Sequence, residues 1–134
     1  MNYNFHSSPE ENPNRLLNVL LRGTYVRPHR HLNPPKAESF IVLEGKAVLF
    51  IFDGDGTVLS HYLLGGATPG ADLSPGVWHT ITALSEHAIC FEVKPGPYSA
   101  HNDKEFAQWA PPEGGVEAQE YLNNLLRIVT GARS

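Results

Sequence analysis

The chain has 134 residues, of which 41% are hydrophobic and 18% charged, and its formal net charge is −4 at pH 7. This acidic balance argues against a protein that binds duplex nucleic acid, which needs a basic surface. No run approaches the roughly 18 apolar residues of a membrane span, and the N-terminus lacks the regions of a signal peptide. The single cysteine, Cys90, cannot form an internal disulfide. We therefore expect a cytoplasmic protein of one domain, residues 1–134.

The sequence predicts short strands joined by turns. Its 12 Gly and 11 Pro residues interrupt apolar runs that are too short for a helical bundle. We expect an irregular N-terminal arm over residues 1–14 and a β-barrel core over residues 15–98. The expected strands cover residues 16–21, 23–28, 39–43, 46–52, 57–64, 77–84 and 88–94, with a hairpin turn at 53–56 and a loop at 65–70.

The pattern changes in the C-terminal tail, residues 99–134. Apolar side chains recur there at helical spacing, at Val116, Ala118, Tyr121, Leu122, Leu125, Leu126 and Val129. This spacing predicts an amphipathic helix ended by Gly131. Many short strands and one terminal helix favour an all-β sandwich or barrel of the jelly-roll kind.

Three histidines and one glutamate form the chemical feature that says most about the chain. His29 and His31 are separated by one residue, Glu38 follows, and His79 lies within the run Pro75–His79. Alternate residues of a strand point to the same face, so His29 and His31 would face one cavity. Imidazole nitrogens and a carboxylate oxygen are ligands of divalent Fe, Mn, Ni or Zn. The alternative is a set of hydrogen-bonded core histidines.

Two motifs resemble those of the cupin superfamily. Gly23-x5-His29-x-His31 with Glu38-x6-Gly45 resembles the first cupin motif, although the Pro34-Pro35 insertion lengthens the spacing from His31 to Glu38. Pro75-Gly76-Val77-Trp78-His79 resembles the second. The resemblance implies a small single-domain cupin, a double-stranded β-helix or jelly-roll barrel with a C-terminal α-helix. It also implies that His29, His31, Glu38 and His79 bind the metal.

The chain is similar, over nearly its entire length, to the WbuC-type cupin-fold metalloproteins. The supporting stretches are residues 4–6, 25–31, 38–40, 77–79, 92–98 and 106–111. This resemblance implies a metal-binding cupin associated with bacterial surface-polysaccharide gene sets, without an established reaction. The resemblance therefore supports a prediction of the fold more strongly than a prediction of the activity.

Strand alternation adds candidate catalytic residues around the metal. If His29 and His31 face inward, Tyr25 and Arg27 do so too, and Arg27 would hold a substrate carboxylate or phosphate. The alternative for Arg27 is an ion pair with Glu92 or Glu44. Glu92 and Lys94 share one face of the last core strand and either reach the pocket or form a surface pair. Tyr98 would close the mouth of the pocket.

Three functions remain open from the sequence. The first is a metal-dependent oxygenase-type or isomerase-type cupin that acts on a small polar or anionic, sugar-related metabolite. The second is a metal-independent sugar-nucleotide isomerase or epimerase, with His79 or His29 as base and Tyr25 or Tyr98 returning the proton. The third is a module that binds a small molecule without turnover. We expect a homodimer, because a second subunit often covers the exposed edge of such a sandwich.

Overall fold

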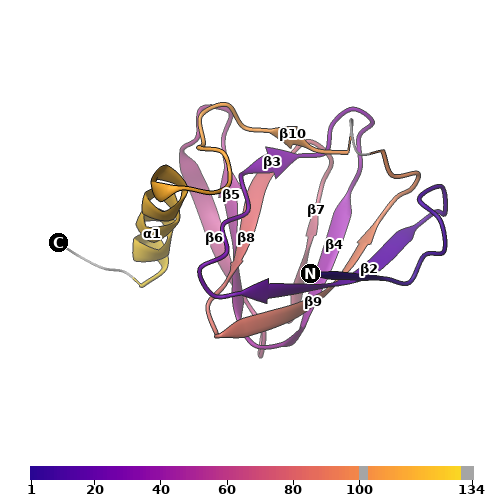
Figure 1. Ribbon diagram of the computed structural model, residues 1–134, viewed down its shortest axis with the longest axis horizontal. Coiled ribbons are helices and arrows are strands. Elements are labelled where there is room, and N and C mark those ends of the chain that lie inside the picture. The colour runs from indigo at the N-terminus through magenta and orange to yellow at the C-terminus, as the bar shows by residue number, and fades with distance from the viewer. Residues whose placement is uncertain (100–102, 131–134) are drawn as a thin grey trace.

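The computed structural model describes residues 1–99 and 103–130 (Figure 1). Two five-stranded antiparallel sheets face each other, in the strand orders β1-β2-β9-β4-β7 and β10-β3-β8-β5-β6. The first sheet contains β1 (Asn2–Asn4), β2 (Asn14–Leu21), β9 (His87–Lys94), β4 (Glu38–Glu44) and β7 (Gly70–Leu73). The second contains β10 (Glu105–Phe106), β3 (His29–Arg30), β8 (Trp78–Ala83), β5 (Ala47–Phe52) and β6 (Val58–Leu64). The all-β fold expected from the sequence is confirmed.

The hydrophobic core lies between the sheets, and a second apolar layer lies outside one of them. Strand β5 is apolar at every position because both of its faces are covered. Leu49 packs into the inter-sheet core, whereas Val48 and Phe50 pack with Leu125 of helix α1 (Val116–Thr130). Figure 1 shows α1 against the outer side of this second sheet. The predicted helix is confirmed, while Gly131, its expected end, lies outside the described residues.

Trp109 attaches the chain that precedes the helix to the second sheet. Its ring lies 5.0 Å from that of Phe52 and 6.0 Å from that of Trp78, measured between ring centres. The ring also lies over Gly56, which has a φ of +97° and where a Cβ would come within 2.8 Å of the indole. A residue without a side chain is required at this turn because it lets the indole cover the β5–β6 hairpin.

Cys90 lies in the inter-sheet core and is fully buried. Burial raises the pKa of its thiol to about 12, so the cysteine is an inert packing residue. In the described residues, no helix has the length and hydropathy needed to cross a membrane.

Several local predictions were wrong. The N-terminal arm contains strand β1, which pairs with β2, and short strands β7 and β10 extend the sheets. The predicted strand at residues 23–28 does not form, and the regular ladder begins only at His29. Instead, hydroxyls of β8 hold this segment: Thr80 donates to the carbonyl oxygen of Val26 at 2.5 Å and Thr82 to that of Thr24 at 3.2 Å.

Candidate metal centre

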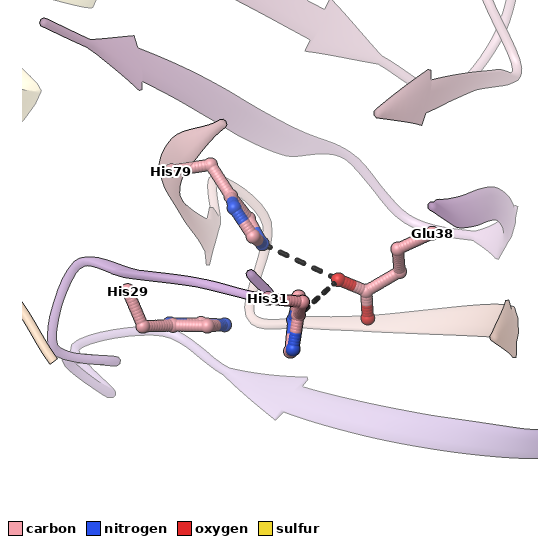
Figure 2. A group of neighbouring side chains, drawn as sticks. All are labelled: His29, His31, Glu38 and His79. Atoms are coloured by element: carbon pink, nitrogen blue, oxygen red, sulfur yellow. Dashed lines mark ion pairs between the residues drawn. The ribbon is translucent and has the colours of Figure 1, made fainter. Parts of the chain in front are cut away.

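The two sheets bring four candidate ligands together between them. His29 on β3 and His79 on β8 are direct partners across the second sheet. Glu38 begins β4 of the opposite sheet, and His31 directly follows β3. One ligand atom from each of the four residues lies within 4.8 Å of the others, and all four side chains are buried. Figure 2 shows the three imidazoles and the carboxylate converging on one point.

Each imidazole is oriented by a backbone carbonyl oxygen at its Nδ1 atom. The pairs are His29 with Arg27 at 2.9 Å, His79 with Val77 at 2.9 Å, and His31 with Asp103 at 2.5 Å. A carbonyl oxygen only accepts hydrogen bonds, so each Nδ1 carries the proton. In the neutral form of each ring, Nε2 then presents a lone pair, which is the arrangement that backbone partners give to metal-binding histidines.

The buried atoms at the centre of the cluster lack a positive partner. Oε1 of Glu38 lies 3.1 Å from Nε2 of His31 and 3.3 Å from Nε2 of His79 (Figure 2). Among the described residues, neither Nε2 of His31 nor Oε1 of Glu38 has a hydrogen-bond partner. Lone pairs that face each other in a buried site are unfavourable unless a cation lies between them. These four residues therefore fit a divalent transition metal.

The protonation states at the site also suit a cation. Burial, together with the neighbouring His79, holds the pKa of His29 well below its ordinary value, so this imidazole is neutral. Burial raises the pKa of Glu38, but hydrogen bonding and positive charge at His31 and His79 outweigh that effect and hold the pKa well below the usual range, and a bound cation would supply positive charge at the same place. Metal ligation requires neutral imidazole and ionised carboxylate, and the directions of the pKa shifts of His29 and Glu38 favour these two forms.

A pocket with a volume of about 360 Å³ opens beside the cluster. His29, Glu38 and His79 line its metal end, and Phe40 and Ile81 provide apolar contact. Strands β1 and β2 contribute a wall of amide side chains, from Asn2, Asn4, Asn14 and Asn18. A small polar molecule in this pocket could thus reach the four candidate ligands while its hydroxyl groups meet hydrogen-bonding side chains.

The fold is similar to that of several solved structures. The capsular polysaccharide assembling protein CapF from Staphylococcus aureus aligns with a TM-score of 0.64 at 21% identity, over 78% of this chain and 31% of CapF. L-ribose isomerase from Cellulomonas parahominis aligns with a TM-score of 0.64 at 14% identity, over 81% of this chain and 69% of the isomerase. The fold is a cupin-like β-barrel.

A third cupin-like neighbour is NovW, a 4-keto-6-deoxy sugar epimerase from Streptomyces spheroides. It aligns with a TM-score of 0.57 at 19% identity, over 69% of this chain and 49% of NovW. A family model described as a domain of unknown function, DUF6016, matches residues 1–64. No curated protein matches the sequence. Because this chain spans less than a third of CapF and about half of NovW, the likeness establishes the cupin-like fold alone.

Glu92 lines the pocket of this cupin-like barrel. Of the two positions considered for it from the sequence, in the pocket or in a surface pair with Lys94, the structure has the first. Glu92 is opposite Phe40 in the pairing of β9 with β4, which places its carboxyl group diagonally from Glu38. Nδ2 of Asn18 donates to Oε2 of Glu92 at 2.9 Å. Burial, reinforced by the charge of Glu38, raises the pKa of Glu92 to about 7. Tyr98 also lines the pocket and is 45% exposed, consistent with a position at the mouth.

Tyr25 and Arg27 lie outside the pocket, so the orientation predicted for them was wrong. The Tyr25 hydroxyl donates to the carbonyl oxygen of Pro111 at 2.8 Å, and its ring packs against helix α1. Arg27 donates from Nε and Nη2 to the carbonyl oxygen of Ala107, at 3.1 and 2.8 Å. Its guanidinium pairs with neither of the expected acids. Both side chains fasten the C-terminal tail to the barrel.

Sequence reasoning missed a buried charge cluster beside the metal end. Asp103 accepts hydrogen bonds from the ammonium groups of Lys36, at 2.9 Å, and Lys94, at 2.5 Å. Burial raises the pKa of Asp103, but the two lysines outweigh this and lower it below the ordinary value. The backbone carbonyl oxygen of Asp103 also holds Nδ1 of His31. This charge cluster therefore supports a candidate metal ligand.

Proposed function

We propose that this protein is a metal-dependent cupin enzyme that interconverts an aldose and a ketose, or a close derivative of such a sugar. The observation that supports this proposal is the convergence of three imidazoles and the Glu38 carboxylate at the end of a polar pocket, with Oε1 of Glu38 lacking a hydrogen-bond partner among the described residues. The structural neighbours include a sugar isomerase and a sugar epimerase, which supports a sugar-related ligand.

His29, His31, Glu38 and His79 would hold a divalent Fe, Mn, Ni or Zn ion. Bound there, the ion would supply Lewis-acid polarisation of the substrate's carbonyl oxygen. The asparagines of β1 and β2 would orient the sugar hydroxyls, and Tyr98 would cover the mouth of the pocket.

Glu92 is the proposed proton-transfer group, because its carboxyl faces the pocket next to Glu38. Its carboxylate would take the proton from the hydroxyl-bearing carbon next to the carbonyl, leaving the electron pair in an enediolate. The same carboxyl, whose proton would exchange with solvent at this stage, would then return a proton to the former carbonyl carbon, while the hydroxyl proton passes to the former carbonyl oxygen. The products have the same composition as the substrate, so no further reactant is needed.

Solvent-deuterium exchange tests this function. Metal-loaded protein in D2O, incubated with a panel of aldoses and ketoses, should incorporate deuterium at the carbon next to the carbonyl, as followed by proton NMR. Glu92→Gln should lower the exchange rate by about 100- to 10,000-fold while it retains metal, because general-base catalysis contributes about that much. The exposed Glu86 offers the control Glu86→Gln, which should exchange like the wild type.

Two results would contradict the proposal and favour the alternatives. Equal exchange before and after metal removal would indicate the metal-independent histidine base, with Tyr98 returning the proton because Tyr25 lies outside the pocket. Sugar binding to the metal-loaded protein without any exchange would indicate a binding module.

A further inference from the structure

The charge cluster beside the pocket contains more positive than negative charge. Lys36 and Lys94 are only 4% and 8% exposed, and both pair with the single carboxylate of Asp103. Two buried ammonium groups that share one carboxylate leave one positive charge uncompensated within the cluster. An uncompensated buried charge is unfavourable, so the cluster is suited to an additional anion.

Of the two lysines, Lys94 is the one that lines the pocket. Lys36 directs its second hydrogen bond to the carbonyl oxygen of Pro97, at 2.7 Å. Lys94 makes one hydrogen bond among the described residues, to Asp103, and an ammonium group has three N–H donors. Its Nζ lies 5.9 Å from the ring centre of Tyr98 at the pocket mouth. Donors of Lys94 therefore remain for a molecule in the pocket.

The other charged groups do not remove this surplus once a metal is bound. Glu38, Glu92 and Asp103 carry carboxyl groups, and Lys36, Lys94 and the exposed Lys104 carry ammonium groups. These charges balance by themselves, so a divalent cation at the histidines would leave the site with a surplus of two positive charges. A ligand that carries an anionic group would then be favoured over a neutral one.

We propose that Lys94, supported by Lys36 and Asp103, forms a subsite for a carboxylate or phosphate group of the ligand. The ligand class is accordingly a sugar acid or a sugar phosphate, whose anionic group lies at Lys94 while its carbonyl end reaches the histidines. This inference rests on the proposed function for the metal and for the sugar. It replaces Arg27, the anion-binding residue expected from the sequence, since that guanidinium is bound to Ala107.

Binding measurements with matched neutral and anionic probes test the subsite. Calorimetric titrations of metal-loaded protein would compare glucose with glucuronate and with glucose 6-phosphate, and inorganic phosphate would serve as the simplest anion. We expect each anionic sugar to bind at least about tenfold more tightly than glucose, since a hydrogen bond to a charged group contributes about 1.5–3 kcal/mol. A preference for glucuronate would indicate a sugar acid, and a preference for glucose 6-phosphate a sugar phosphate.

Lys94→Met should remove this preference, whereas Lys94→Arg, which keeps the charge, should retain it. Lys46→Met is the matched control, because this exposed lysine lies beside Gly65 and does not line the pocket, and it should change the preference less than about twofold. Circular dichroism and metal analysis would verify that each variant is folded and loaded. An unchanged preference in Lys94→Met, or a wild-type protein that binds no anionic probe more tightly than glucose, would overturn the subsite.

Different experimental results would reject the proposed subsite and the proposed reaction. Absent deuterium exchange with an intact preference for anions would reject the isomerisation and leave the subsite standing. Exchange that proceeds equally well with neutral and anionic sugars, without a binding preference, would reject the subsite and leave the reaction standing.

Discussion

Replacing His79 by alanine is expected to lower the affinity of the protein for Zn²⁺ or Mn²⁺ by more than about 100-fold. Residues that merely orient a ligand already contribute about 10- to 100-fold, and His79 offers its Nε2 directly to the cluster. A competition titration against a chromogenic chelator would measure the change. His87→Ala is the matched control, because that histidine lies at the surface beside Glu44, away from the candidate ligands.

His79→Ala should also remove the dependence of the protein's thermal stability on added metal. Metal at about 100 times its dissociation constant stabilises a folded protein by about 2.7 kcal/mol, provided that the unfolded chain does not bind it. We therefore expect added metal to raise the melting temperature of the wild type and of His87→Ala but not that of His79→Ala. An affinity of His79→Ala within about threefold of the wild type would show that His79 is not a ligand.

Replacing Asp103 by asparagine is expected to destabilise the protein by about 3–5 kcal/mol. The change removes the only carboxylate that Lys36 and Lys94 share in the described residues, and breaking a buried ion pair costs about this much because a charge is left uncompensated. Urea unfolding followed by circular dichroism would measure the free energy of unfolding. Asp72→Asn, at an exposed aspartate, should change it by less than about 0.5 kcal/mol.

A second substitution shows whether Asp103→Asn loses stability through an uncompensated charge or through altered packing. Adding Lys36→Met to Asp103→Asn removes one of the two uncompensated ammonium groups and should recover part of the lost stability. Asp103→Asn within about 1 kcal/mol of the wild type would mean that the buried lysines do not depend on this carboxylate.

Most of the barrel could be predicted from the sequence because its strands carry local signals. Glycine and proline separate the apolar runs, and the tail has a helical period. The clustering of His29, His31, Glu38 and His79 could be predicted because cupin motifs preserve residue spacing along paired strands, whereas their role as metal ligands stays a prediction. Glu38 joins the cluster despite its longer distance from His31 because the insertion folds into a closed turn. In that turn, the N–H of Lys36 donates to the carbonyl oxygen of His31 at 3.2 Å.

The wrong predictions concern segments whose structure does not follow a strand or helix period. Alternation placed Tyr25 and Arg27 in the cavity, but it holds only within a strand, and residues 24–28 follow the turn at Gly23, with its φ of +86°, without joining a ladder. The charge cluster had no local signal, because 67 positions separate Lys36 from Asp103. The WbuC-type subgroup, the homodimer and the cytoplasmic location stay predictions.

We propose above that His29, His31, Glu38 and His79 bind a divalent metal. The most direct test is the metal content, by mass spectrometry, of protein purified without added metal, beside the double variant His29→Ala/His31→Ala. We predict near-stoichiometric Fe, Mn, Ni or Zn in the wild type and almost none in the folded double variant. Absence of metal from the wild type, even after incubation with each of these ions, would contradict the metal centre, as would equal metal content in both proteins.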